Sequence, residues 1–297
     1  MLMNSFPNCS KRLVLQVAAL SPSTYYYNRK RVLPKLKPGP KPKFNDKQVL
    51  SAVKDYLKNP LFFLEGYKKI HKRLVKQGIT VAKERLRRIM SEANLLCHQI
   101  KRDCVNTNPH NGSITTNRPN ELWGMDVKEF KTKMGKIYFM GVIDHFNSGI
   151  MGWHMNTKHK SAQVMQALRN AVQNEFGETF KNVCQNAGLS LRIDHGSEFD
   201  SKAFDKELLF LGIRKSSSYI RSPQCNGIIE RFHKTLKEQL INIYVVEDLE
   251  SAKTIMAEFI ERYNNYWLIH RLGLMSPLEY RENNKPSGNN EPEGVRH

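Results

Sequence analysis

The sequence predicts a multidomain protein in which all-α segments precede an α/β domain, and three observations support this. Residues 1–110 hold 23 lysines and arginines against 6 aspartates and glutamates, a net charge of +17, whereas residues 111–297 hold 24 against 22. Up to residue 97 the apolar residues recur at helical spacing. Beyond residue 118, short runs typical of strands are interleaved with helical segments. A basic helical part followed by a mixed sheet accounts for all three.

The basic first third indicates a polyanionic partner, and nucleic acid is the commonest one. A basic surface that only aids solubility is the alternative, but it rarely concentrates charge so unevenly. The five cysteines are odd in number and scattered, which argues against a disulfide framework. No run reaches the roughly 18 to 20 apolar residues of a membrane span, and residues 13–20 are too short for a signal core and contain Gln16. We therefore expect a soluble cytoplasmic protein without a membrane partner.

The N-terminal segment, residues 1–36, has the outline of a helix-turn-helix. Residues 13–20 form a short apolar stripe, and a second helix begins near Thr24. This second helix is aromatic and then basic, and Arg29 and Arg31 are its candidate DNA contacts. An amphipathic hairpin with its charges in solvent explains the same pattern equally well.

A proline- and lysine-rich run at residues 37–44 predicts an extended, semi-rigid linker, because proline and glycine deny it a helix or a sheet. Its alternating lysines, Lys41 and Lys43 among them, could follow a phosphate backbone or enter a minor groove of DNA. A solvated spacer is the commoner fate of such runs. The linker separates the first helical segment from a second one.

Residues 45–97 are predicted to form a second helical domain. Its apolar stripes lie at residues 49–57, 67–74 and 86–90. A basic third helix after a glycine turn is typical of a helix-turn-helix DNA-binding domain. The candidate DNA contacts on this helix are Lys83, Arg85 and Arg88. A solvated helix face is their alternative role, and the polar residues 98–117 predict a second linker.

Residues 118–281 are predicted to form the α/β domain, and residues 282–297 a polar tail. The expected strands cover residues 122–130, 136–143, 149–156 and 189–193. The expected helices cover residues 162–176, 201–211, 226–244 and 249–267. A polar loop is expected at residues 216–225. A meander followed by alternating strands and helices predicts a mixed sheet flanked by helices.

Three carboxylates occupy positions suited to metal-dependent chemistry. Asp126 lies within the first strand and points away from the alternating Trp123 and Met125. Asp194 directly follows the fourth strand, where the crevice of an α/β sheet usually opens, and Glu230 lies in the first turns of a helix, whose dipole favours an ionised carboxylate. Such oxygen ligands suit Mg²⁺ or Mn²⁺, and two ions about 3.5 to 4 Å apart could activate the attacking oxygen and stabilise the leaving one. Each carboxylate alone is by default a cap or a surface group.

The spacing of these residues makes the combination more specific than its parts. Between Asp194 and Glu230 lie 35 residues, and Lys237 follows Glu230 by seven positions. Residues 230, 233, 234 and 237 fall on one face of an α-helix, so this face can meet DNA. The candidate DNA contacts on this helix are Arg231, His233, Lys234 and Lys237. The expected buried stripe opposite consists of Ile229, Phe232, Leu236, Leu240 and Ile243.

Six motifs occur in an order that is specific when taken together. They are Gly66-Tyr67-Lys68-Lys69-Ile70-His71, Arg118-Pro119-Asn120-Glu121-Leu122-Trp123-Gly124-Met125-Asp126, Asp194-His195-Gly196-Ser197-Glu198-Phe199, Ser222-Pro223-Gln224-Cys225-Asn226-Gly227-Ile228-Ile229-Glu230-Arg231-Phe232, Arg262-Tyr263-Asn264-Asn265-Tyr266 and Ser276-Pro277-Leu278-Glu279-Tyr280. Over nearly its full length the chain thereby resembles the second-frame product of the IS-three family of bacterial insertion sequences, a group of transposases. Residues 118–281 resemble the catalytic core of retroviral-integrase-like transposases, which implies an RNase H-like fold.

The resemblance implies that Asp126, Asp194 and Glu230 are the metal ligands and that Lys237 contacts the terminal DNA of the element. It implies metal-dependent nicking at the element ends, followed by attack of a liberated 3′-OH on another phosphodiester without a covalent protein–DNA intermediate. We expect Mg²⁺ or Mn²⁺, two ions in each active site. The expected partners are double-stranded DNA (the terminal inverted repeats and the target), a second copy of the chain or a larger assembly, and an upstream-frame product or fusion.

Four alternatives compete with this interpretation. Asp144 in the second strand could share a carboxylate site with Asp126. The residues that invite a zinc interpretation are His71, Cys97, His98, Cys104 and His110, but they lack paired ligand spacing, so no zinc is expected. A DNA-binding regulator that uses the core as a scaffold would be signalled by a lost ligand, and all three are present. A nuclease that cuts without joining stays open.

Overall fold

The computed structural model describes residues 10–23, 42–97, 115–193, 196, 198–217 and 227–284. The chain divides into two compact units, residues 1–45 and 46–297. In the first unit the structure describes α1 (Lys11–Val17), which begins after Ser10, whose side chain accepts a hydrogen bond from the Leu13 amide. The second helix expected near Thr24 lies outside the described residues. Among the described residues, no helix combines the length and the apolar character needed to cross a bilayer.

The second unit starts with the three helices that the sequence predicts. They are α3 (Asp46–Lys58), α4 (Tyr67–Lys76) and α5 (Lys83–Glu92). Their buried side chains are those of the predicted stripes and include Val49, Val53, Ile70, Leu74, Leu86, Ile89 and Met90. The turn after α4 passes through Gly78, whose φ of 82° lies in the left-handed region that glycine adopts without strain.

A five-stranded mixed sheet forms the centre of the second unit. Its strands are β1 (Leu122–Thr132), β2 (Gly135–Asp144), β3 (Ile150–Asn156), β4 (Ser190–Ile193) and β5 (Arg214–Ser217), in the order β3-β2-β1-β4-β5. The three meander strands pair antiparallel, whereas β4 pairs parallel to both β1 and β5. The predicted mixed sheet is therefore confirmed. Strand β1 lies at its centre, between β2 and β4.

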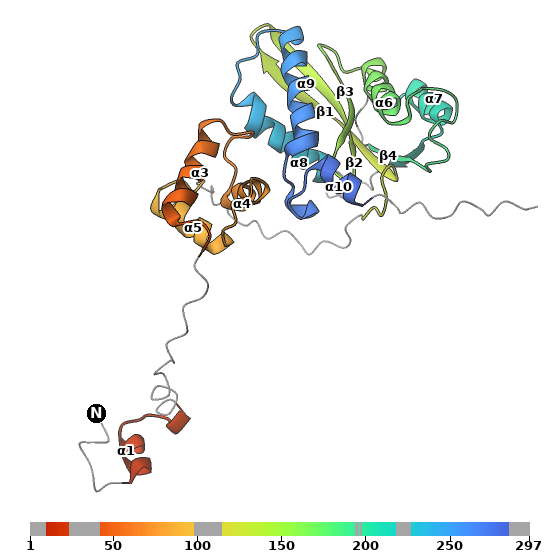
Figure 1. Ribbon diagram of the computed structural model, residues 1–297. Helices are drawn as coiled ribbons and strands as arrows, with labels where there is room; N and C mark the ends of the chain where they lie inside the picture. The colour runs from red at the N-terminus through yellow and green to blue at the C-terminus, as the bar shows by residue number, and fades with distance from the viewer. Residues whose placement is uncertain are drawn as a thin grey trace, which may run out of the picture. The chain divides into compact units, whose positions relative to one another are not determined.

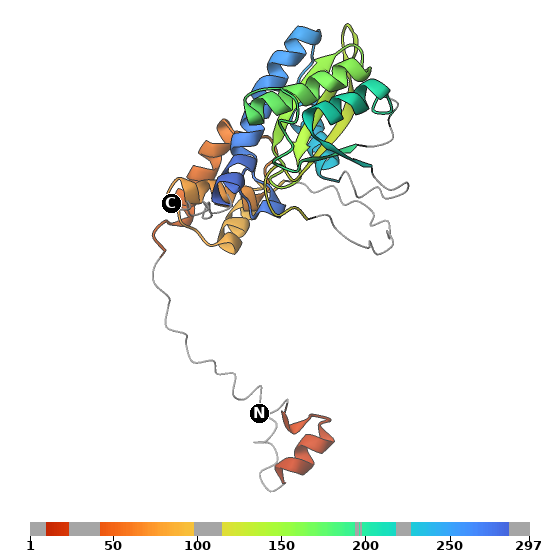
Figure 2. The same cartoon turned by 90° about the vertical axis from the view of Figure 1, so that its right-hand side faces the viewer.

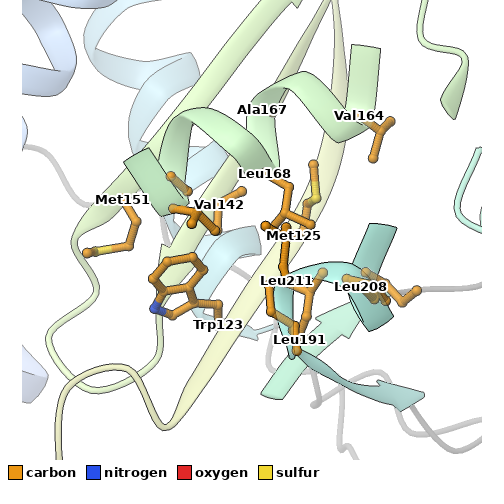
Figure 3. Close-up of a cluster of buried hydrophobic side chains, with 14 of the residues drawn as sticks. Trp123, Met125, Val142, Met151, Val164, Ala167, Leu168, Leu191, Leu208 and Leu211 are labelled. Atoms are coloured by element: carbon orange, nitrogen blue, oxygen red, sulfur yellow. The ribbon is translucent and has the colours of Figure 1, made fainter. Parts of the chain in front are cut away.

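One face of the sheet is covered by α6 (Ser161–Phe176) and α7 (Lys202–Leu211), which lie side by side in Figure 2. The buried cluster beneath them combines Trp123 and Met125 of β1 with apolar residues of both helices, as Figure 3 shows. Helix α6 can approach the sheet closely because β3 carries Gly152. A Cβ at that position would lie 2.2 Å from the backbone nitrogen of Ala171.

The opposite face is covered by helices from the last part of the chain (Figure 1). They are α8 (Gly227–Leu236), the π-helical turn η3 (Lys237–Ile241) and α9 (Leu249–Tyr266), followed by the 3₁₀ turn η4 (His270–Leu272) and α10 (Pro277–Asn283). Their cluster includes Phe139 of β2 and Phe62 from the segment before α4. The layers are thus helices, sheet and helices, with β1 between two apolar clusters.

Three details differ from the sequence-based expectation. The helix expected at residues 226–244 is α-helical only to Leu236 and continues as the π turn. The π turn ends at Ile241, so Ile243, expected in the buried stripe, lies beyond the helix and is 40% exposed. The strand β5 replaces the start of the expected polar loop, and α10 forms where no helix was predicted.

The segment around α4 is fastened to the last helices by polar groups. The side chain of Gln239 in η3 accepts from the Phe63 amide and donates to the Phe63 carbonyl, each at 2.8 Å. Arg73 of α4 donates to the two oxygens of Glu65 at 2.7 and 2.8 Å. Its Nη2 also donates to the carbonyl of Tyr266 at 3.0 Å. A buried charge pair thus links α4 to the end of α9.

We expect Arg73→Met to lower the free energy of unfolding by about 3 to 5 kcal/mol, because it leaves the carboxylate of Glu65 buried without its cation. The Glu65 side chain is only 1% exposed. Chemical denaturation of the full chain measures the effect. Lys58→Met is the matched control, since Lys58 and Asp55 are 75% and 62% exposed, and it should cost less than about 1 kcal/mol. Equal losses for both variants would contradict the role of the buried pair.

Candidate active site

Asp126 is the polar residue of β1 that faces α8. The alternation of the strand places Trp123 and Met125 in the cluster beneath α6, so Asp126 points to the other side. Its side chain is 23% exposed, and its Oδ1 accepts a hydrogen bond from the Val127 amide at 2.7 Å. The cross-strand neighbour of Asp126 is Gly141, which adds no side chain beside the carboxylate. This carboxylate is therefore held but still reachable from solvent.

His233 of α8 contacts this carboxylate. Its Nδ1 lies 3.3 Å from Oδ2 of Asp126, and its side chain is 6% exposed. The ring packs edge-on against Phe139 of the sheet and lies beside Phe232. Its Nε2 is buried and has no hydrogen-bond partner within the described part of the chain. The prediction that His233 contacts DNA is therefore wrong, because the helix buries this side chain against the sheet.

Glu230 lies in the first turn of α8, three residues before His233, and is exposed. Residues three apart on an α-helix are neighbours on its surface, with about 5–6 Å between their Cβ atoms. Because His233 touches Asp126, the carboxylate of Glu230 projects from the same side of α8 one turn earlier. Asp126 contacts His233, and Glu230 lies one helical turn before that residue in α8.

Asp194 lies outside the described residues, as do Arg29, Arg31 and Lys41. The described ladder ends just before Asp194 and pairs Arg192 of β4 with Gly124 of β1. No group of three metal-binding side chains is found among the described residues. Two of the three candidate carboxylates can therefore be located.

The remaining predicted DNA contacts are either exposed to solvent or paired with carboxylates of the protein. On α8 and η3, Arg231 and Lys237 are exposed, and Lys234 is 38% exposed with its Nζ 3.7 Å from Glu238. The basic residues of α5 are instead mostly paired within the protein. Arg85 and Arg88 both donate to Asp46, at 2.8 and 2.6 Å, and Arg88 also pairs with Glu92. The exposed residues Lys43 and Lys83 complete the set.

Asp144 does not join the carboxylate site. It pairs with Trp123 in the sheet, whereas Asp126 pairs with Gly141. Asp144 is fully buried and accepts hydrogen bonds from the amides of Phe146 and Asn120. Burial raises its pKa to about 6, against the opposing effect of these two donors. Its role is to hold the turn after β2.

The residues considered for zinc are engaged elsewhere where the structure describes them. The Nε2 of His71 lies 2.7 Å from the carbonyl of Val81, and the thiol of Cys97 donates to the carbonyl of Glu65. The other three, His98, Cys104 and His110, lie outside the described residues. The described residues thus offer no zinc site.

Sequence reasoning missed a buried basic group beside the site. Arg192 is 9% exposed and lies level with Gly124 in the sheet, on the same side as Asp126. Its Nε and Nη1 have no hydrogen-bond partner in the described residues, while Nη2 is 3.4 Å from Ser216. An arginine between Leu191 and Ile193 in an apolar strand was the available signal, since a buried arginine needs an anion or another acceptor.

Comparison with known proteins identifies the class of this domain. Two family models, both described as integrase core domain, match the chain over residues 116–223 and 211–277. A chain of the simian T-cell lymphotropic virus intasome in complex with PP2A regulatory subunit B56 gamma is 16% identical and has a TM-score of 0.49. That match covers 82% of this chain and 78% of the viral one. The two family models together place residues 116–277 in the integrase core domain, and the mixed five-stranded sheet lies within this range.

The relatives of known type are transposases of bacterial insertion sequences. The putative transposase InsK for insertion sequence element IS150 of Escherichia coli (strain K12) is 27% identical over 280 residues, which cover 90% of this chain and 92% of the relative. The transposase for insertion sequence element IS904 of Lactococcus lactis subsp. lactis (strain IL1403) is 30% identical over 167 residues, 56% of this chain and 63% of the relative. These matches support a bacterial insertion-sequence transposase with an integrase-like core, and they indicate a polynucleotidyl transferase of the DDE type.

We expect His145 to stay neutral in the folded protein down to about pH 4. It is 2% exposed, and burial, with the nearby Arg192 and Arg271, lowers its pKa to about 4. A base whose pKa is lower in the folded state stabilises the fold above its unfolded pKa of about 6.5, and this stability is lost as the pH falls from there towards 4. The raised pKa of Asp144 changes stability with pH in the opposite direction, so a substitution of His145 is needed to separate the contributions of the two residues.

The measurement compares chemical denaturation of the wild-type protein and His145→Gln at pH 7 and pH 5. The stability advantage of the wild type should shrink by on the order of 1–2 kcal/mol at the lower pH. A difference that does not change with pH would show that His145 does not titrate in this range. An NMR titration of the imidazole ring gives the pKa directly.

Proposed function

We propose that this transposase binds the terminal inverted repeats of its own element and catalyses metal-dependent DNA cleavage and 3′-OH strand transfer through Asp126, Asp194 and Glu230. One observation supports the assignment: His233, three residues after Glu230 in α8, contacts Asp126 of the central strand at 3.3 Å. Asp126 is partly exposed and Glu230 is exposed, so both carboxylates are accessible. The third, Asp194, follows the strand that pairs with β1.

The chemistry of the donors fits a hard divalent cation. The located groups are carboxylates that remain accessible, and oxygen ligands of this kind suit Mg²⁺ or Mn²⁺, in one or two sites. Asp126, Asp194 and Glu230 would hold the metal. When bound, it would supply positive charge to the phosphodiester and to the attacking and leaving oxygens.

The remaining residues orient the site and bind DNA. A proton on Nδ1 of His233 would point at Asp126 and fix the direction of that carboxylate. The exposed cations Arg231, Lys234 and Lys237 lie along the same helix as Glu230 and would contact phosphates of the element end. The helical residues 45–97, a helix-turn-helix in this proposal, would add contacts from Lys83.

The proposed reaction also defines the partners. Double-stranded DNA is both the element end and the target, and an upstream-frame product or fusion would be a protein partner. Because a bacterial element lies in the DNA of the cytoplasm, the enzyme would act there. Both element ends must be held together, so the chain would act as a dimer or a larger assembly on DNA.

We expect Glu230→Gln to lower strand transfer by on the order of 10²-fold or more, the scale of losing one electrostatic group at a reacting centre. Labelled candidate end DNA is incubated with Mg²⁺ or with EDTA, and joined products are measured together with DNA affinity. The affinity should be retained, because the substitution removes no cation. Asp194→Asn should behave in the same way.

Glu258→Gln is the control, since Glu258 is exposed on α9 and the change in charge is the same. Joined products that persist in Glu230→Gln, or that do not need metal, would refute the catalytic assignment. Cleavage without joining by the wild type would identify a nuclease. Tight end binding without cleavage or joining, even with an upstream-frame partner present, would identify a DNA-binding regulator.

The proposed assembly predicts at least two protein chains in the complex that holds a pair of element ends. The mass of the purified protein–DNA complex, measured by light scattering or native mass spectrometry, tests this. One chain for each pair of ends would contradict the proposal. The protein without DNA serves as the reference.

A further inference from the structure

A basic pocket opens beside the candidate active site, on the flank of α8 that carries Arg231. It has a volume of about 420 Å³ and lies between residues of α4, α8, α9 and η4. Its cationic lining consists of Lys69, Arg231, Lys234 and Arg271, and its acidic lining of Glu238. The imidazole of His270 also lines it. Gly227, the first residue of α8, also lines it. The pocket therefore borders the helix turn that carries Glu230.

Lys69 of α4 is the central observation. Its Nζ lies 3.2 Å from the centroid of the Trp267 ring, and the side chain is half-buried. Within the described part of the chain, this ammonium has no hydrogen-bond or ion-pair partner; its neighbour on the protein is an aromatic face. Burial lowers the pKa of Lys69 to about 8. Glu65 and Glu238 act against this decrease, but neither forms an ion pair with the ammonium among the described residues. An anion that enters the pocket would offset the remaining cost of desolvation.

The other charged groups that line the pocket leave it with more positive than negative charge. Burial lowers the pKa of His270, and Lys69, Lys68 and Arg231 lower it further, which favours the neutral imidazole beside these cations. Arg231 is exposed and has no ion pair among the described residues. The one acidic side chain, Glu238, lies 3.7 Å from the ammonium of Lys234. The pocket keeps a net positive charge.

Arg271 also lines the pocket, and its guanidinium already donates hydrogen bonds within the protein. Its Nη2 donates to Ser148 Oγ at 2.7 Å and to the carbonyl of His145 at 3.0 Å. The guanidinium therefore fixes the wall, while Lys69 and Arg231 have donors left for a ligand. Two cations from different parts of the fold, one on α4 and one on α8, converge on the same space.

We propose that this pocket binds a backbone phosphodiester of the DNA strand that runs to Glu230, with Lys69 and Arg231 as its ligands. The inference rests on the proposed function and deepens it. It names the atom group bound beside the active site and makes α4 part of the DNA site. A single phosphodiester carries one negative charge and several acceptor oxygens, which match an ammonium and a guanidinium.

The test measures DNA affinity without metal, so that binding is separated from catalysis. Lys69→Gln and Arg231→Gln are each compared with the wild type on a labelled duplex of candidate end DNA over a range of salt concentrations. Each variant should bind roughly tenfold more weakly, the scale of one charge-assisted hydrogen bond, and the slope of log affinity against log salt should fall by about 0.9 for each lost phosphate contact.

Lys76→Gln is the matched control. It lies on the same helix and removes the same charge, but Lys76 is already paired with Glu279 at 2.7 Å outside this pocket. It should keep the wild-type slope. A thermal melt of each variant confirms that it is folded. Wild-type affinity and slope in Lys69→Gln and Arg231→Gln would overturn the proposal, and so would an equal loss in Lys76→Gln.

A free anion is the alternative ligand, and pyrophosphate is the probe for it. A rise in melting temperature with pyrophosphate that Lys69→Gln abolishes, together with unchanged DNA binding by that variant, would identify a small-anion site and overturn the DNA assignment. The proposed function fails on different evidence, the absence of metal-dependent joined products from the wild type. The two failures are therefore distinguishable.

Discussion

The site depends on one constraint, which is that the first part of β1, Leu122–Met125, is buried on both faces. The side of the strand under α6 is filled there by Trp123 and Met125, so the side chain of the next residue, Asp126, alternates with Met125 and points towards α8. On that side, the neighbour of Asp126 across the sheet is Gly141, and a Cβ there would lie 2.5 Å from the ring of Phe139. Glycine thus lets an aromatic ring and a carboxylate share one narrow face. The carboxylate is positioned by the packing around it.

Helix α8 follows from the same constraint. Its residues Ile229, Phe232 and Leu236 are buried in the cluster that covers this face of the sheet. When these residues are packed in the cluster, the neighbouring side of the helix, which carries Glu230 and His233, lies next to β1. The hydrophobic stripe therefore sets the height and the rotation of the acidic group, and the His233 contact completes the link to Asp126.

Much of this arrangement could be predicted because it is written in local patterns. Alternating strands and helical stripes gave β1 to β4, α6, α7 and α9 within a few residues. Strand β5 could not be predicted from the sequence, because its residues Arg-Lys-Ser-Ser show no apolar alternation. Only its pairing with β4 at the edge of the sheet defines it. The π turn could not be predicted either, because it accompanies a contact between Gln239 and Phe63, which are far apart in the sequence. Helical periodicity placed His233 with Glu230 correctly but could not show which side the sheet would bury.

The basic residues show why sequence alone could not separate DNA contacts from structural charges. Arg85 and Arg88 lie on a helix of the expected type, yet both pair with Asp46 and Arg88 also pairs with Glu92. Lys69, which looks ordinary in the sequence, lies on an aromatic ring and forms no ion pair with a carboxylate among the described residues. The distinction lies in whether the fold supplies the counter-charge. Where it does, the cation contributes to the fold; where it does not, the protein holds a desolvated positive charge whose cost an incoming phosphate would offset.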